Sequence, residues 1–465
     1  MQLGDLLDDL AIDATTGRIE VTNVQIDSRQ CAGGSLFFAL SGATTNGVSF
    51  ARDAVARGAV AVVASAPVDV AAPVLVVPAT QLRALLSETS AAIVGHPEFG
   101  VELVGVTGTN GKTTVTTLVA QLARALGWNG ANVGTLTNER TTPFAPELFR
   151  TLAQLVAEFD PSRERSVVAL EVSSHALDQG RVDGLRFAVA AFTNLSHDHL
   201  DYHGSMERYF QSKASLFRSE CAQRVVLWGD DPYGQRLAAM SRGPVSTVSR
   251  RDAHGVALSL RGTTFFWRDR LVNTPLVGGY NVDNALIAMS MVSVLGASDR
   301  DVAAAMSSVH GVDGRFEVVE SGDVVVIVDY AHTPDGLRRL LNDVRELTSD
   351  GRIGLVFGCG GDRDREKRPQ MGAVASELAD FTIVTSDNPR SEAPEAIIDA
   401  IMSGVVAGAT VRRERDRRRA IGEVLEWAQP GDVVVLAGKG HERTQIFADE
   451  VVAFDDRVVA RELMR

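Results

Sequence analysis

Gly105-Val106-Thr107-Gly108-Thr109-Asn110-Gly111-Lys112-Thr113-Thr114 is the stretch that decides the fold of this chain. It follows an apolar run, residues 101–106, that predicts a buried strand, and it precedes a helix-forming run, residues 115–126. Glycines at such a junction let backbone N–H groups approach phosphate oxygens, while the lysine supplies a charge and the next threonine a hydroxyl for magnesium. The stretch therefore predicts a loop that holds the phosphates of ATP.

One position departs from the usual pattern of such loops. The glycine that commonly stands five residues before Gly111 is replaced by Val106, so the core is the shorter segment Gly108–Thr113. The alternative is an ordinary strand–turn–helix corner with chance glycines. The strand before the loop and the helix after it favour the phosphate loop.

The length and net charge of the chain limit its number of domains and the classes of partner it can bind. A chain of 465 residues predicts two to four domains. Its net charge of -13 argues against nucleic acid or an anionic membrane as the main partner. Three cysteines without metal-ligand spacing suit a reducing compartment, and neither a leader-like N-terminus nor a long uncharged apolar run is apparent. We expect a cytoplasmic protein without membrane insertion.

Short apolar runs alternate with helical patterns, which predicts an α/β fold with parallel sheets. Three blocks emerge, residues 1–97, 98–315 and 316–465, separated by segments rich in glycine or proline. The strand candidates are residues 24–27, 36–40, 59–63 and 74–77 in the first block, 101–106, 166–172 and 188–194 in the second, and 324–329, 353–358, 381–386 and 433–437 in the third.

Two polar clusters follow strands of the second block. Glu171 leaves a buried strand where a carboxylate can hold magnesium opposite Thr113, although Ser173 or Ser174 could instead merely cap a helix there. Residues 192–204 crowd histidines and aspartates at the next strand end. Zinc is one possibility, but the absence of nearby cysteines and the neighbouring phosphate loop favour magnesium, with His199 as a ligand.

Each strand of the third block also ends in a polar or glycine-rich segment. Because carboxyl ends of parallel strands share an edge, these four segments predict a second ligand surface. They are residues 329–334, 357–369, 386–390 and 438–442. The basic run 412–419 could suggest RNA binding, but it contains Glu414 and Asp416, so a solvated helix start is favoured.

Taken together, these clusters resemble the Mur ligases of peptidoglycan synthesis, and among them the tripeptide synthetases of the MurE type. Gly-Thr-Asn-Gly-Lys-Thr-Thr at 108–114 fits MurE and MurF ligases, whereas folylpolyglutamate synthetases typically read Gly-Lys-Gly-Ser at its end. The segments Asp27-Ser28-Arg29 and 34–39 resemble the MurE uridine-binding domain. The resemblance implies a small N-terminal α/β UDP-binding domain, a central P-loop domain with a parallel or mixed sheet, and a Rossmann-like C-terminal domain.

The resemblance also implies residue roles. Lys112, Glu171, His199 and Lys213 would be catalytic, with Thr113, Glu171, His199 and Lys213 around magnesium. Lys213 falls where relatives carry a lysine carbamylated by carbon dioxide, which turns a cation into an oxygen ligand. ATP would contact Gly108, Thr109, Asn110, Gly111, Lys112, Thr113, Thr114, Asn281, Asn284, Arg315 and Asp329. The UDP substrate would contact Ile26, Ser28, Ala43, Thr44, Thr45, Thr141, Thr142, Ser173, Gln179 and Arg181.

A further motif indicates which amino acid is added. Asp387-Asn388-Pro389-Arg390 matches relatives that add meso-diaminopimelate, in which the arginine pairs with the distal carboxylate. Arg363, Gly438 and Glu442 fall at further family contacts to this substrate. Arg140 departs from the family, because relatives often have a smaller polar residue before Thr141.

The resemblance implies a monomeric ligase that uses ATP and Mg²⁺, takes a UDP-N-acetylmuramoyl-dipeptide and a diamino acid, and binds no nucleic acid. It would form an amide bond through an acyl phosphate, without an enzyme nucleophile. Two alternatives stay open at this point. One is a MurF-type or lysine-adding ligase, and the other is a nucleotide-binding scaffold that has lost ligation.

Overall fold

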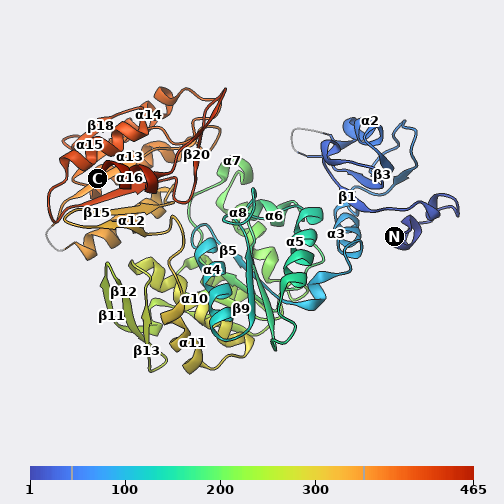
Figure 1. Cartoon of the computed structure of the whole chain (residues 1–465), viewed down its shortest axis with the longest axis horizontal. Coiled ribbons are helices and arrows are strands. Elements are labelled where there is room, and N and C mark those ends of the chain that lie inside the picture. Colours follow the sequence, from blue (N-terminus) through green and yellow to red (C-terminus); the bar gives the residue numbers. More distant parts are fainter. Residues whose placement is uncertain (43–45, 349–350, 465) are drawn as a thin grey trace.

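A computed structural model describes residues 1–42, 46–348 and 351–464. The chain forms three α/β domains, and the N-terminal and C-terminal domains are attached to opposite sides of the central one (Figure 1). The three-domain α/β architecture expected from the sequence is thereby confirmed. The boundaries after residues 97 and 315 stay predictions. The turn Ala43, Thr44 and Thr45 lies outside the described residues.

The N-terminal domain is built on a four-stranded parallel sheet with the order β1-β2-β3-β4. Its two inner strands are almost entirely buried, which explains their continuous apolar sequence. The strands are β1 (Asn23–Gln25), β2 (Ser35–Ala39), β3 (Ala59–Ala64) and β4 (Val74–Val76), and the helices are α1 (Leu3–Leu6), α2 (Ala51–Ala56) and α3 (Leu82–Ala92).

The central domain contains a six-stranded parallel sheet with the order β10-β9-β8-β5-β7-β6. β5 lies between β7 and β8, with Val106 beside Glu171 and Thr107 beside Phe192. The phosphate loop and the polar clusters after β7 and β8 therefore share one edge of the sheet, as expected for an open α/β fold. The strands are β5 (Glu102–Thr107), β6 (Asn129–Val133), β7 (Ser166–Glu171), β8 (Val189–Phe192), β9 (Val225–Trp228) and β10 (Val245–Val248).

Helices cover both faces of this sheet (Figure 1). α4 starts directly after the phosphate loop and packs beside α10, which is buried along most of its length. This rigid packing holds the N-terminus of α4 in place. The helices are α4 (Lys112–Ala125), α5 (Ala145–Glu158), α6 (Ser174–Asp178), α7 (Leu200–His203), α8 (Met206–Ala214), α9 (Pro232–Met240), α10 (Gly279–Leu295) and α11 (Asp299–Ala305).

The central domain also holds a small antiparallel sheet that the parallel pattern did not predict. It has the order β11-β12-β13, with β11 at Ala253–Ser259, β12 at Gly262–Trp267 and β13 at Arg270–Thr274. Side chains of β12 alternate between the core and solvent, so that Phe265 and Trp267 are buried and Phe266 is exposed. Phe265 and Trp267 belong to the same core as α4 and α10.

The C-terminal domain has a second six-stranded sheet, with the order β14-β15-β19-β16-β17-β18. β14 is an antiparallel edge strand, and the other pairings are parallel. The strands are β14 (Glu317–Ser321), β15 (Val325–Asp329), β16 (Ile353–Phe357), β17 (Phe381–Val384), β18 (Val411–Arg413), β19 (Val433–Ala437) and the separate pair β20 (Thr444–Ile446) and β21 (Val451–Ala453). The helices are α12 (Pro334–Leu347), α13 (Lys367–Leu378), α14 (Pro394–Met402), α15 (Arg417–Trp427) and α16 (Asp456–Leu463).

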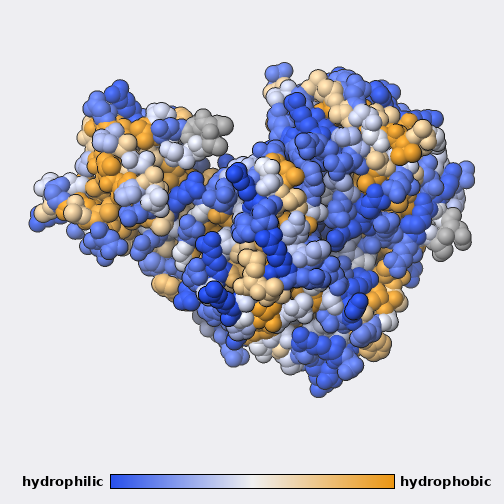
Figure 2. Space-filling view, turned by 180° about the vertical axis from the view of Figure 1, so that it is seen from behind, coloured by the Kyte–Doolittle hydropathy of each residue, from blue (hydrophilic) through white to orange (hydrophobic). Residues whose placement is uncertain are grey.

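The molecular surface also shows that the N-terminal domain is set apart from the C-terminal domain (Figure 2). Seen from behind, the N-terminal domain projects from the rest of the molecule, with a notch between it and the C-terminal domain (Figure 2). Among the described residues, the helices are all too short or too polar to cross a membrane.

Candidate active site

The phosphate loop lies between β5 and α4 and has the tight backbone that its glycines allow. Gly111 has a φ of +88°, and a Cβ there would meet Asn284 Oδ1 at 2.5 Å. A Cβ on Gly108 would collide with the hydroxyl of Thr193. The Lys112 ammonium folds back over the loop, where it donates to the carbonyls of Gly108 at 3.0 Å and Thr109 at 2.9 Å. Burial lowers its pKa. This arrangement leaves the N–H groups at the start of α4 facing the cleft.

Two side chains that offer oxygen ligands to a metal, Thr113 and Glu171, meet at the edge of the loop. The Thr113 hydroxyl donates to Glu171 Oε2 at 2.9 Å, and Thr135 donates its backbone N–H to Glu171 Oε1 at 2.8 Å. Glu171 is 1% exposed, so the carboxylate is held firmly. A hydroxyl and a carboxylate at this spacing are the kind of oxygen ligands that magnesium prefers.

The residues assigned to ATP in α10 and beyond also gather near the loop. Asn284 lines the cleft, and its Nδ2 donates a 3.2 Å hydrogen bond to Asn281 Oδ1, which fixes its orientation. Arg315 donates to the Thr113 hydroxyl at 3.1 Å. Asp329, on β15, lines the cleft but also accepts from the Tyr280 hydroxyl at 2.7 Å, which ties the C-terminal domain to α10.

His199 lies at the start of α7 beside a buried carboxylate. Its Nε2 is 3.4 Å from Asp198 Oδ2, and His332 and Lys367 of the C-terminal domain lie 4.0 Å from the same carboxyl group. Burial would raise the pKa of Asp198, but these three neighbours lower it. Burial also lowers the pKa of His199, although Asp198 opposes this effect. The histidine is therefore a neutral imidazole, the form that binds metals.

Lys213 on α8 is buried immediately behind the phosphate loop. It is 1% exposed, donates to the Gly108 carbonyl at 2.7 Å, and lies 4.6 Å from the centre of the Tyr209 ring. Burial, reinforced by the charge of Lys112, lowers its pKa well below the ordinary value. Such surroundings favour the neutral amine, which is the nucleophilic form of lysine.

The residues assigned to the dipeptide form one hydrogen-bonded group next to Glu171. Thr142 donates its hydroxyl to the Glu171 carbonyl at 2.8 Å and accepts from the Ser173 backbone at 3.0 Å. Arg181 donates to the Thr142 carbonyl at 2.7 Å and to Gln179 Oε1 at 2.7 Å. Thr141, the next residue along, lines the cleft.

The N-terminal residues assigned to the UDP group lie elsewhere. Ser28 is buried and begins a short 3-10 helix, Ser28–Gln30, that is capped by Asp27, and Ile26 is half-buried beside it. Both belong to the N-terminal domain, on the far side of the central domain from the C-terminal loops (Figure 1). The structure does not bring them to the phosphate loop.

Four loops of the C-terminal domain complete the cleft opposite the phosphate loop. They follow β15, β16, β17 and β19, as expected for one edge of a sheet. The cavity has a volume of about 350 Å³ and is lined by both domains. Its lining includes Lys112, Thr113, Glu171, His199, Arg315, Asp329, Arg363, Asp387, Asn388, Arg390, Gly438 and Glu442.

Arg390 reaches this cleft through an unusual backbone. Its φ is +52°, and its guanidinium donates to the Gly361 carbonyl at 2.8 Å. A Cβ on the neighbouring Gly360 would lie 2.8 Å from Arg390 Nη1. Pro389 is set back, and its carbonyl leaves no space for a side chain at Gly361. The guanidinium is thus held at the wall of the cleft with donors available for an anionic group.

Lys439 is a residue of the site that the sequence analysis did not single out. It is fully buried, and its ammonium donates to Glu442 Oε2 at 3.0 Å, Asn388 Oδ1 at 3.3 Å and the Thr444 carbonyl at 2.7 Å. Asn388 in turn donates to Glu442 at 2.7 Å. Its position in the glycine-rich segment 438–442 after β19 was the available signal.

Comparisons with known proteins agree with this geometry. Three family models match, namely the Mur ligase family catalytic domain at residues 20–94, the Mur ligase middle domain at 106–292, and the Mur ligase glutamate ligase domain at 314–440. The chain is 44% identical to UDP-N-acetylmuramoyl-L-alanyl-D-glutamate--2,6-diaminopimelate ligase of Gloeobacter violaceus, covering 100% of this chain and 98% of the relative. The enzyme of the same name from Geobacillus kaustophilus is 44% identical, with 97% and 96% covered.

A solved structure of an enzyme with this name is also similar. It shares 33% sequence identity with this chain and superimposes with a TM-score of 0.68, covering 100% of this chain and 98% of the other.

Proposed function

The chain belongs to the Mur ligase family of ATP-dependent ligases, and we propose that it adds meso-diaminopimelate to UDP-N-acetylmuramoyl-L-alanyl-D-glutamate. The observation that supports this most is the shared cleft. A phosphate loop on one domain faces four polar loops on the next, which is the layout that a ligase needs to bring a phosphorylated acid and an amine together.

Two steps follow from that layout. A carboxylate oxygen of the D-glutamate attacks the terminal phosphorus of ATP, the bond to ADP breaks, and an acyl phosphate forms. The amine of the second substrate then attacks the acyl carbon, loses a proton and releases phosphate. Neither step needs a nucleophile from the protein, so the contribution of Lys112, Arg315 and the start of α4 is to neutralise and orient the transferring group.

Magnesium fits the donors present. The Thr113 hydroxyl and the Glu171 carboxylate offer oxygen ligands on a rigid support, and the neutral imidazole of His199 faces the same cleft. When bound, the ion would supply positive charge to the phosphates. Thr113, Glu171 and His199 would hold the ion, and Lys112 would supply a second positive charge at the same phosphate loop.

Lys213 would contribute as a carbamate. The unprotonated amine attacks carbon dioxide and loses a proton, giving an anionic oxygen donor at the end of a buried side chain. The environment supports this chemistry, because the amine is buried behind the loop and held by the Gly108 carbonyl and the Tyr209 ring.

Selection of the amino acid would depend on Arg390. The guanidinium is suited to a bidentate pair with the distal carboxylate of meso-diaminopimelate, a group that lysine lacks. Asn388 and Glu442, held by Lys439, lie on the same wall and offer partners for the distal amino group. The dipeptide would lie along Thr141, Thr142, Ser173 and Arg181, with the UDP group toward Ile26 and Ser28 of the N-terminal domain.

An amino-acid panel tests this proposal. Purified protein with ATP, Mg²⁺ and the UDP-dipeptide should release phosphate with meso-diaminopimelate and show at least about 100-fold lower kcat/KM with L-lysine, since loss of a bidentate ion pair costs about 3 kcal/mol. A preference for lysine would contradict the role of Arg390, and no product with any amine would contradict ligation. The same preparation should sediment as a monomer, and we expect the reaction to take place in the cytoplasm.

A further inference from the structure

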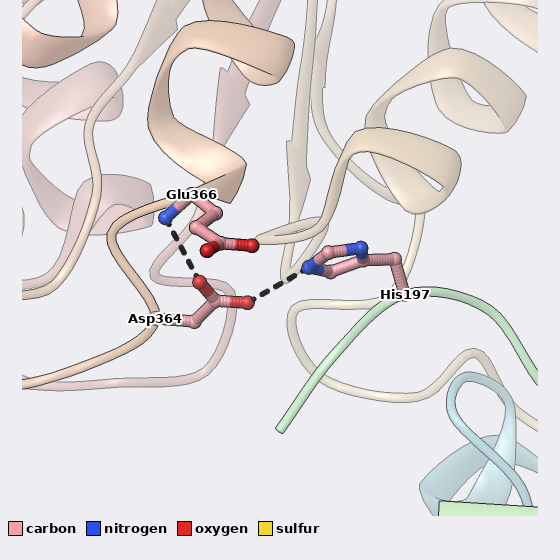
Figure 3. Close-up of side chains that lie close together, drawn as sticks. All are labelled: His197, Asp364 and Glu366. Atoms are coloured by element: carbon pink, nitrogen blue, oxygen red, sulfur yellow. Dashed lines mark hydrogen bonds and ion pairs between the residues drawn. The ribbon is translucent and has the colours of Figure 1, made fainter. Parts of the chain in front are cut away.

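Three metal-ligating side chains from two domains converge at the rim of the cleft, where Asp364 is part of the cleft lining. His197 lies in the loop after β8 of the central domain, whereas Asp364 and Glu366 lie in the loop before α13 of the C-terminal domain. One ligand atom from each lies within 4.8 Å of the others. His197 Nε2 is 3.1 Å from Asp364 Oδ2, and the Glu366 carboxylate lies beside the Asp364 carboxyl group with one oxygen toward the imidazole (Figure 3).

Asp364 is already fixed in a ligating orientation. Its Oδ1 accepts the backbone N–H of Glu366 at 2.9 Å, which leaves Oδ2 directed at the imidazole. The Asp364 side chain is 7% exposed, while His197 is 31% exposed. A distance of 3.1 Å between an imidazole nitrogen and a carboxylate oxygen suits two neighbouring ligands of one ion, because each bond to zinc is about 2.0–2.2 Å long.

The cations of the same loop are turned toward other partners. Arg368 and Arg365 both pair with Glu392, at 2.8 and 3.3 Å. Lys367 instead faces Asp198, at 4.0 Å. Of the three acidic residues in 362–368, Asp364 and Glu366 lie near His197, whereas Asp362 accepts a hydrogen bond from Ser391.

The group is also accessible. His197 lines a second cavity of about 440 Å³ that opens beside α12 and α13. An ion and its waters would therefore reach the imidazole from solvent without passing through the ATP cleft.

We propose that His197, Asp364 and Glu366 bind one Zn²⁺ ion, with water completing its coordination. One imidazole with two carboxylates favours zinc over magnesium, which prefers oxygen donors alone. Because the ligands come from both domains, the ion ties the loop after β8 to the loop that carries Arg363. This site is separate from the magnesium ligands assigned above and does not depend on the proposed reaction.

Zinc binding to the full chain tests the site. Metal-free protein is dialysed against Zn²⁺ with Mg²⁺ in excess, so that sites made of oxygen donors are filled, and bound zinc is measured by mass spectrometry. The wild type should bind one more equivalent than His197→Ala, in which affinity for that equivalent should fall at least about 100-fold, since even outer-shell changes cost about 10–100-fold. His254→Ala, which removes an exposed histidine of β11, should behave as wild type.

Thermal unfolding and cobalt absorption distinguish loss of the metal site from misfolding of a variant. Zinc should raise the Tm of wild type and of His254→Ala but not of His197→Ala or of the milder Glu366→Gln, while all four should have similar Tm values without metal. Cobalt in place of zinc should give a visible absorption band that is lost in the His197→Ala and Glu366→Gln variants. Equal zinc stoichiometry and affinity in wild type and His197→Ala would overturn the proposal.

Discussion

Lys439 and Glu442 form an ion pair, 3.0 Å between Nζ and Oε2, in which the lysine is fully buried beneath the wall of the cleft that carries Asn388 and the glutamate is partly exposed. The lysine does not face the cleft itself. Two of its three hydrogen bonds instead fix the orientation of two residues that do, Asn388 and Glu442. We regard it as a positioning residue.

Lys439→Met should therefore raise KM for the amino acid by at least about tenfold, or about 1.4 kcal/mol, while KM for ATP changes little. The change also leaves the partly exposed Glu442 carboxylate and the Thr444 carbonyl without this donor, which lowers stability by about 1 to 3 kcal/mol. Steady-state kinetics and thermal unfolding measure both effects. The double variant Lys439→Met/Glu442→Gln should recover much of the stability but not the KM. Arg443→Met, next to the site but 76% exposed, is the matched control.

The sequence predicted eleven of the parallel strands, because their signal is local, but it missed β6, β9, β10 and β18. Runs such as residues 353–358 and 433–437 are short, rich in valine and closed by a polar segment, which matches strands buried on both faces. The antiparallel sheet β11–β13 was missed because it interrupts a parallel pattern. The alternation of Phe265, Phe266 and Trp267 between core and solvent was its available signal.

The site was predicted as separate clusters, and the structure alone shows how they meet. That Glu171 lies within reach of Thr113 follows from the pairing of β5 with β7, which no local pattern specifies. The surroundings of Asp198 could not be predicted from a local pattern either, because its neighbours His332 and Lys367 come from another domain. Lys439 was missed because a lysine is ordinarily solvated, and burial depends on contacts distant in sequence.

Glu171→Gln should lower kcat/KM about 100- to 1,000-fold, as expected when one preorganised charge is removed from a phosphoryl-transfer site. The amide keeps the shape and can still accept from Thr135, so the loss reflects charge rather than packing. The apparent affinity for Mg²⁺, measured from phosphate release at varied Mg²⁺, should weaken in parallel. Glu102→Gln, at the start of β5 and paired with Arg165, should leave both values near wild type. An unchanged Mg²⁺ dependence in Glu171→Gln would contradict its assignment as a ligand.

Lys213→Ala should lose at least about 100-fold in kcat, because an anionic group near the phosphates disappears. Added chloride, a small anion, should restore part of the activity. Protein equilibrated with carbon-13-labelled carbon dioxide should give a carbamate NMR signal that the variant lacks. Lys439→Met, which also removes a buried lysine, should keep that signal. Full activity of Lys213→Ala without added chloride would show that no carbamate is needed.

The ion pair of Glu392 with Arg368, near the loop that carries Arg363, makes the stability of the fold depend on pH in the acid range. The hydrogen bonds that Glu392 accepts from Arg368, at 2.8 and 3.0 Å, lower its pKa from 4.5 to about 2. A depressed pKa stabilises the fold above pH 4.5, and this stabilisation is lost as the pH falls from 4.5 toward 2. Glu392→Gln should thus cost about 3 kcal/mol at pH 7 and much less near pH 2, measured by urea unfolding at each pH. Glu395→Gln, which breaks an exposed pair with Arg415, should cost under about 1 kcal/mol throughout. If the cost of Glu392→Gln is the same at both pH values, the Arg368 pair does not set the pKa.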